Sequence, residues 1–194
     1  MKIRYFRKLG ERLVEKMGNI ISFNHTVKIN DDSLAMSNGL TDVLIDYLLL
    51  SGSELAETDS EKDLIVYIAE KQQSIIGIGN VDFSIVDMPW VKETFETDKR
   101  FLLRVVKHAK ELAIQNSVWE MMGYMPDIYM LDRALLGFKM LVKRMTVDDV
   151  VIDEFMEFLK ERDGEEPLIV GYQKCPKHGV YMSYLGCKFC NDGV

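Results

Sequence analysis

Four side chains near the C-terminus constrain this 194-residue chain more than any other feature. Cys175 and His178 are separated by two residues, as are Cys187 and Cys190, and eight residues lie between the pairs. A two-residue spacer lets both side chains of a pair reach one ion across a tight turn, and two pairs complete the tetrahedron that zinc prefers. The spacing therefore predicts one zinc ion per chain. Because four protein ligands leave no open coordination position, we expect this zinc to be structural.

The residues around the two pairs fit tight metal-binding turns. Gly179 follows the first pair, where such a turn needs a backbone of positive φ that glycine adopts at no steric cost. Asn191 follows the second pair, and asparagine is the next most tolerant residue there. Between the pairs, the apolar and aromatic residues 180–185 predict a short hairpin arm.

Residues 175–179 read Cys-Pro-Lys-His-Gly and residues 187–190 read Cys-Lys-Phe-Cys. These two stretches resemble the C-P-x-C/H-G and C-x-x-C elements of zinc-ribbon and rubredoxin-type zinc-knuckle modules. The resemblance covers residues 175–190 and nothing upstream. It implies a small β-hairpin held by zinc, and the short spacer between the pairs favours a minimal hairpin over a full three-stranded ribbon.

A disulfide is the competing interpretation of the cysteines. All three cysteines of the chain fall in this window, and an odd number cannot pair completely. We find no apolar core of a secretory signal near the N-terminus, so we expect a cytoplasmic protein with reduced thiols. A hairpin this small cannot bury a core of its own, and zinc would supply its folding free energy, on the order of 10 kcal/mol.

Composition limits the classes of protein that this chain can belong to. Apolar residues make up 47% of the chain, enough for a packed core. The 31 acidic residues outnumber the 24 basic ones, and the resulting net charge of −7 disfavours non-specific coating of nucleic acid. Because no stretch approaches eighteen uninterrupted apolar residues, we expect no membrane span.

Helical spacing of apolar residues dominates the rest of the chain, so we expect a mainly α fold with minor β. The predicted architecture is a bundle-like body of about six helices over residues 1–163, with a zinc-knuckle tail over residues 164–194 docked on it. Turns are predicted at Asn38-Gly39 and after the helix 41–50, and a capping box at residues 60–63. Helices are predicted at residues 2–18, 41–50, 60–72, 99–116 and 127–145, and a further helix is predicted to follow a cap at 146–149. Short strands are predicted at 26–29, 81–85 and 168–170.

Two further groups of titratable residues are candidate sites. Asp42 and Asp46 lie one helical turn apart and could bind a metal, but a charged helix edge is the preferred interpretation. His108 and Glu111 could share a proton or a metal, and an exposed surface pair is preferred. The glycine-rich residues 77–82 lack the third glycine and the following helix of a dinucleotide loop.

The chain lacks the common hydrolase, metalloprotease and P-loop motifs, which makes an enzyme the less favoured hypothesis. The leading hypothesis is a non-enzymatic zinc-binding protein whose tail serves structure and protein–protein recognition. It rests on four rings near the metal ligands that exceed what a small hairpin can bury: Tyr172, Tyr181, Tyr184 and Phe189.

Three alternatives stay open from the sequence. The first is nucleic-acid binding through the tail, where Lys174, Lys177 and Lys188 lie beside stackable rings. The second is an acidic immunity-type or inhibitor protein that neutralises a basic partner by charge complementarity. The third is an enzyme with an acidic site that carries no recognisable motif.

Overall fold

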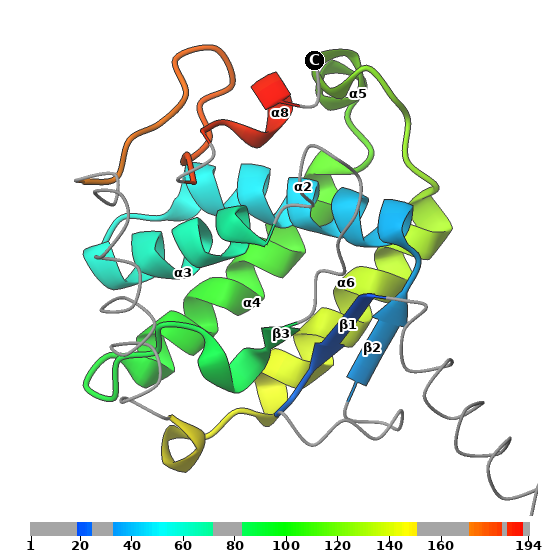
Figure 1. Ribbon diagram of the computed structural model, residues 1–194. Coiled ribbons are helices and arrows are strands. Elements are labelled where there is room, and N and C mark those ends of the chain that lie inside the picture. Colours follow the sequence, from blue (N-terminus) through cyan, green and yellow to red (C-terminus); the bar gives the residue numbers. More distant parts are fainter. Residues whose placement is uncertain (1–18, 25–32, 72–82, 151–170, 184–185, 192–194) are drawn as a thin grey trace, which may run out of the picture.

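The computed structural model of the chain describes residues 19–24, 33–71, 83–150, 171–183 and 186–191 (Figure 1). Within these ranges the fold is mainly α with a small sheet, as the sequence predicts. The elements predicted at residues 2–18, 26–29 and 168–170, the glycine-rich residues 77–82 and the boundary between residues 163 and 164 lie outside them. The helices of the described residues are α2 (Asn38–Leu55), α3 (Asp59–Glu70), α4 (Phe95–Leu112), α5 (Asn116–Met122), α6 (Ile128–Arg144) and α8 (Lys188–Asn191).

Three short strands form one sheet in the order β2-β1-β3. They are β1 (Asn19–Ser22), β2 (Ser33–Met36) and β3 (Phe83–Ser84). The central strand β1 pairs antiparallel with β2 and parallel with β3. Strand β2 lies against α6, where Leu34 fills the space beside Gly137: a Cβ there would lie 2.8 Å from Leu34 Cδ1. Strand β3 confirms the strand predicted at 81–85 for residues 83–84.

The hydrophobic core lies where α2 and α4 cross, between α3 on one side and α6 on the other (Figure 1). The apolar stripe predicted on α4 is buried as expected, with Phe101, Leu102 and Val105 fully inaccessible to solvent. Helix α6 presents Leu135 and Phe138 to the same core. The central position of α2 matters for the site, because α2 also carries the C-terminal tail.

Helix α2 is longer at both ends than the sequence predicts. The turn predicted at Asn38-Gly39 is wrong, because these residues form the first turn of the helix. Ser37 is the N-cap, and its hydroxyl accepts a hydrogen bond from the Leu40 N–H at 3.3 Å. At the other end the helix continues through Gly52, where a Cβ would lie 2.6 Å from Ile65 Cγ1. Glycine at 52 therefore permits close packing of α3 on α2 and does not end the helix.

The capping box of α3 lies two residues earlier than predicted. Thr58, not Ser60, is the N-cap, and its side chain accepts a hydrogen bond from the Glu61 N–H. The Glu61 carboxylate in turn accepts from the backbone N–H of Thr58. The four residues from Thr58 to Glu61 fit the Thr-x-x-Glu pattern of a capping box, in which glutamate reaches back further than aspartate. The predicted inward face of this helix is confirmed by buried Leu64 and Ile68.

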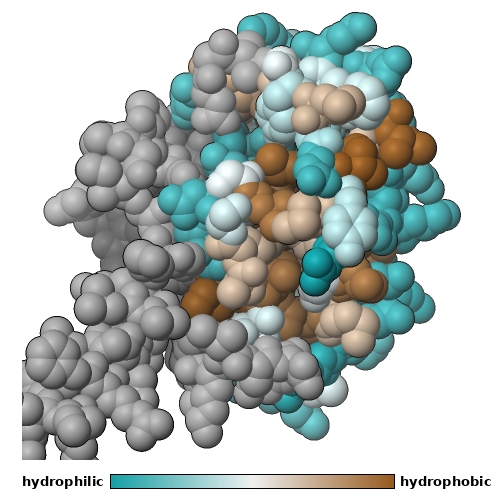
Figure 2. All heavy atoms as spheres, turned by 90° about the vertical axis from the view of Figure 1, so that its right-hand side faces the viewer, coloured by the Kyte–Doolittle hydropathy of each residue, from teal (hydrophilic) through white to brown (hydrophobic). Residues whose placement is uncertain are grey.

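The loop around Pro126 connects α5 to α6. Gly123 ends α5 in a left-handed conformation with φ 71°, and Asp127 caps α6 by accepting from the Met130 N–H. The exposed side of α6 includes apolar side chains, among them Tyr129 and Met140. Figure 2 shows apolar side chains gathered among polar ones on the face of the molecule that includes α6 and β2.

Candidate metal centre

The structure brings the four predicted metal ligands together. The Sγ atoms of Cys175, Cys187 and Cys190 and the Nδ1 atom of His178 all lie within 4.8 Å of one another. His178 Nδ1 lies 3.3, 3.5 and 3.6 Å from the sulfur atoms of Cys187, Cys190 and Cys175, respectively. The four side chains thus form one cluster that could hold a metal ion.

Four of the six separations within the cluster match the edges of a tetrahedron around zinc. Bonds of about 2.3 Å to sulfur and about 2.0–2.1 Å to nitrogen give S···S edges of about 3.8 Å and S···N edges of about 3.5 Å. The sulfur atoms of Cys175 and Cys190 lie 3.8 Å apart, and the three S···N distances average close to the second value. All three cysteines are free thiols in the structure. The donor set therefore fits one tetrahedral ion.

The first pair of ligands lies in a tight turn closed by backbone hydrogen bonds. Gly179 N–H donates to the Cys175 carbonyl at 2.8 Å, and Cys175 N–H donates to the Val180 carbonyl at 2.8 Å. Gly179 has φ 68°, which confirms the positive φ predicted after His178. A side chain at this position would be strained, so glycine is required by the turn.

The second pair is held by a helical turn. Helix α8 begins at Lys188, and Asn191 N–H donates to the Cys187 carbonyl at 3.0 Å. The positive φ predicted for Asn191 is wrong, because every described residue with positive φ is a glycine. The helical turn places Cys187 and Cys190, three residues apart, on the same side. Gly186, with φ 90°, supplies the sharp change of direction immediately before it.

The hairpin between the two pairs is minimal. Its described residues form only isolated bridges, one between Lys174 and Tyr181 and one between Ser183 and Gly186. The structure thus agrees with a small metal-binding module, and a three-stranded ribbon is not present in the described part of the tail. Since these few bridges cannot hold a fold by themselves, the stability of the tail must come from packing on the body and from an ion that the cluster could hold.

Burial and local hydrogen bonds set the protonation of the ligands in the metal-free chain. Burial raises the pKa of the Cys187 thiol to about 12. Burial also acts to raise the pKa of Cys175, but the backbone N–H groups of His178 and Lys177 and the neighbouring thiols outweigh it and lower that pKa. Burial, with a contribution from Lys177, lowers the pKa of His178, which favours the neutral imidazole that a metal needs.

The metal centre is joined to α2 by a buried ion pair. Lys188 Nζ lies 2.9 Å from Asp46 Oδ1 and 3.4 Å from Asp42 Oδ1. Tyr124 O–H, from the loop between α5 and α6, donates to Asp46 Oδ2 at 2.8 Å. Burial raises the pKa of Asp46 to about 6, although the positive charge of Lys188 acts to lower it. The sequence predicts that Asp46 lies on a charged helix edge. The structure instead buries Asp46 in an ion pair with Lys188, which lies between the ligands Cys187 and Cys190.

A second set of contacts fixes the start of the tail near the C-terminal end of α2 and on α3. Tyr181 N–H donates to the Ser53 hydroxyl at 3.0 Å, and Lys174 Nζ donates to the Ser53 carbonyl. Tyr172 O–H donates to Asp63 Oδ1 at 2.8 Å. In Figure 1 the tail, coloured orange to red, accordingly lies along α2 with α8 close to α5.

The aromatic rings of the tail pack against other residues of the chain. Tyr181 and Phe189 are buried, and Phe189 packs against the His178 ring with centroids 5.6 Å apart. Tyr172 is partly buried and meets Tyr181 edge to face. Of the four rings that suggested a partner, Tyr184 lies outside the described residues. The two buried rings therefore need no other protein to cover them.

The tail lysines that suggested nucleic-acid binding are largely engaged. Lys188 is buried on the two aspartates of α2, and Lys174 donates to Ser53 while its ammonium lies over the Tyr181 ring. Lys174 and Lys177 are exposed. A basic surface for phosphate contacts would need more exposed cations than the two that the described part of the tail presents.

The predicted pair of His108 and Glu111 is confirmed as a surface contact, with Nδ1 3.4 Å from the Glu111 carboxylate. The sequence missed Glu54 of α2, whose carboxylate lies 2.7 Å from His108 Nε2. Burial disfavours the charged ring, but the two carboxylates outweigh it and raise the pKa of His108. No metal cluster other than the Cys₃His group occurs among the described residues.

No known protein family, curated protein or solved structure shows a significant match to this chain. Within the described ranges, no helix combines the length and the hydropathy that a membrane crossing requires.

Proposed function

We propose that Cys175, His178, Cys187 and Cys190 bind one Zn²⁺ as a structural ion. The observation that carries this proposal is the closed Cys₃His set, in which the three S···N separations and the separation between Cys175 and Cys190 match a zinc tetrahedron. Cysteine and histidine ligands favour zinc over the hard cations calcium and magnesium, which prefer oxygen. In this role the ion folds the tail and places Lys188 on α2.

A non-enzymatic role for the metal centre follows from its coordination. A catalytic zinc keeps a position open for water or substrate, and four protein ligands leave none. Zinc ligation requires reduced cysteines, so we place the protein in a reducing compartment such as the cytoplasm. The described residues lend no support to protein recognition through the tail, which stays a prediction.

Metal content tests the proposal. The full chain is purified without chelator or added metal and measured by inorganic mass spectrometry, beside Cys187→Ser and the control Lys177→Ala. The control changes an exposed residue between two ligands without removing a donor. We expect one equivalent of zinc in the wild type and the control, and a clear loss in Cys187→Ser. Metal-free wild type, or undiminished zinc in Cys187→Ser, would overturn the proposal; another stoichiometric metal would overturn the choice of ion.

A further inference from the structure

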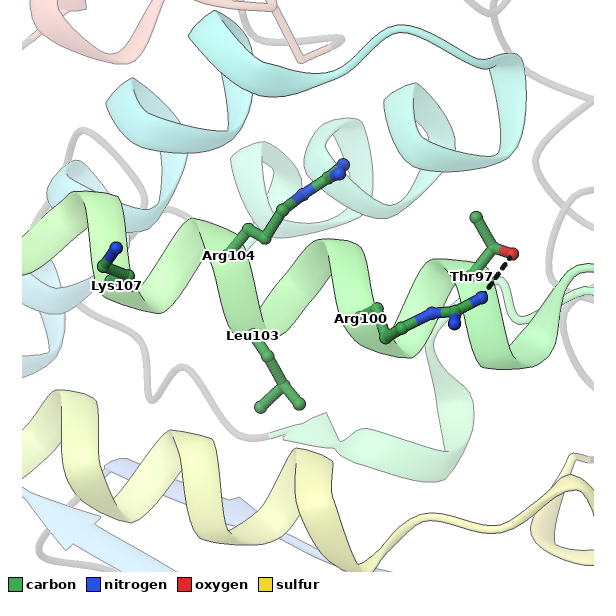
Figure 3. A pocket seen from close by; sticks show the side chains of 5 residues that line it. All are labelled: Thr97, Arg100, Leu103, Arg104 and Lys107. Carbon is green, nitrogen blue, oxygen red and sulfur yellow. Dashed lines mark hydrogen bonds between the residues drawn. The ribbon is translucent and has the colours of Figure 1, made fainter.

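A cationic cavity lies along the solvent side of α4, away from the metal centre. Its volume is about 500 Å³, within the range of small-molecule sites. The described residues that line it all come from α4 (Figure 3). Four of them recur at spacings of three and four, so they form one stripe along the helix. The lining residues are Thr97, Arg100, Leu103, Arg104 and Lys107.

The cavity concentrates positive charge in an acidic protein. Of the five described residues that line it, three are cationic and none is acidic, whereas the chain carries a net charge of −7. Arg100 makes one hydrogen bond, from its guanidinium to Thr97 Oγ1 at 3.4 Å, and among the described residues it meets no carboxylate. Lys107 lies 3.7 Å from Glu111, an exposed pair that solvent screens. Arg100 is therefore the lining cation whose charge is most available to a ligand.

Arg104 is held in place by a buried carboxylate. Its guanidinium donates to Glu61 Oε1 at 3.1 Å, and the other oxygen of Glu61 accepts the N–H groups of Glu57 and Thr58. In Figure 3 Arg104 extends from α4 towards α3, while Arg100 runs along the helix to Thr97. The contact with Glu61 uses part of a guanidinium that has five N–H donors, so the capping box of α3 positions Arg104 and leaves donors free.

The spacing of the cations selects the chemical class of the ligand. Arg100 and Lys107 are seven residues apart, which corresponds to about 10 Å along a helix. Because the Arg100 side chain runs to Thr97, away from Lys107 (Figure 3), one phosphate does not reach both groups as they lie, whereas a chain of linked phosphates can. Guanidinium groups match the geometry of phosphate oxygens, and lysine adds a point charge. We propose that this cavity binds a small ligand with two or more linked phosphate groups, through Arg100, Arg104 and Lys107.

Calorimetric titration of the full chain at low ionic strength tests this site. The probes are tripolyphosphate and adenosine triphosphate, which share linked phosphates and differ in the nucleoside. Arg100→Gln is the main variant, because among the described residues Arg100 has no ion pair whose loss would perturb folding. Arg133→Gln, an exposed arginine of α6, is the matched control for charge. Thermal unfolding of each variant shows that the fold is retained.

We expect saturable binding of tripolyphosphate, weakened about tenfold or more in Arg100→Gln and unchanged in Arg133→Gln. If adenosine triphosphate binds more tightly than tripolyphosphate, the ligand is a nucleotide. If it binds equally or more weakly, the site recognises the phosphate chain alone. No binding of either probe, or equal losses in the two variants, would overturn the proposal. Binding of single-stranded oligonucleotides without either small probe would overturn it in favour of a nucleic-acid surface.

Discussion

The Nζ atom of Lys188 lies 2.9 Å from Oδ1 of Asp46, so the second ligand pair of the candidate metal centre reaches the middle of α2. Both side chains are almost inaccessible to solvent. Because Lys188 directly follows Cys187 and begins α8, the fold of the metal-binding turn determines where its ammonium lies. This ion pair couples the metal centre to the helical body.

Removing Lys188 should destabilise the protein strongly. In Lys188→Met the Asp46 carboxylate stays buried without its cation, which typically costs about 3–5 kcal/mol. The free energy of unfolding, measured by denaturant titration, should fall by this amount. The exposed control Lys177→Met should change it little.

A double variant separates the loss of the pair from the loss of one partner. Lys188→Met with Asp46→Asn removes both charges and keeps an acceptor for Tyr124, so it should recover much of the stability. A loss in Lys188→Met no greater than that in Lys177→Met would show that the ion pair does not hold the tail.

The stability of the protein should carry a pH dependence from Asp46. Burial, only partly offset by Lys188, raises its pKa in the folded state to about 6, above the usual value in the unfolded chain. The folded state then holds the proton more tightly, so the contribution of Asp46 is full below pH 4 and is lost as pH rises through 6. Between pH 5 and 7.5 this loss is roughly 1.4 kcal/mol.

The comparison with Asp46→Asn isolates this effect from other groups, including the metal ligands. Between pH 5 and 7.5 the wild type should lose roughly 1.4 kcal/mol of unfolding free energy relative to Asp46→Asn, which lacks the titrating carboxyl group. NMR titration of the Asp46 carboxyl carbon gives the same pKa directly. A midpoint near 4 would contradict a pKa that burial raises above the usual value.

Replacing two glycines of α2 with alanine, one at a time, should change the free energy of unfolding in opposite directions. At Gly52 a Cβ would lie 2.6 Å from Ile65 Cγ1, so Gly52→Ala should lower the free energy of unfolding by about 1–3 kcal/mol through overpacking. At Gly39 a Cβ meets no atom within 4 Å, so Gly39→Ala should raise it by about 0.4–1 kcal/mol. Thermal denaturation of the pair checks the packing of α3 on α2; equal effects would refute it.

Metal removal should release the tail while leaving the helical body folded. The tail has few hydrogen bonds of its own, and the cluster holds its two ends together. Chelation, or Cys175→Ser, should therefore expose residues 171–191 to limited proteolysis, with little loss of far-ultraviolet circular dichroism. Mass spectrometry of the fragments identifies the cleavage sites. An undiminished resistance of the tail after complete metal removal would count against a structural ion.

The sequence was sufficient for what is encoded locally. The spacing of Cys175, His178, Cys187 and Cys190 predicted the cluster, because a two-residue spacer brings both members of a pair to one point. The apolar periodicity of α4 and α6 predicted their buried faces. The sequence also contained enough information to identify Thr58 as the helix cap, since Thr-x-x-Glu fits the capping box better than the Ser-x-x-Asp pattern that begins two residues later.

What the sequence could not show depends on contacts between distant segments. Asp46 and Lys188 are 142 positions apart, and nothing in the local pattern pairs them. The available signal was a carboxylate within a strongly apolar helix, which must find a cation if it is buried. Likewise, Ser51-Gly52 has the composition of a turn, and only the approach of Ile65 explains a glycine inside the helix.

X-ray absorption at the zinc edge, on protein purified without added metal, tests the central claim most directly. A structural Cys₃His site predicts three sulfur neighbours at about 2.3 Å and one nitrogen at about 2.0–2.1 Å. Cys187→Ser should lose one sulfur neighbour or the metal itself. A first shell dominated by oxygen, or fewer than three sulfur neighbours in the wild type, would contradict the account.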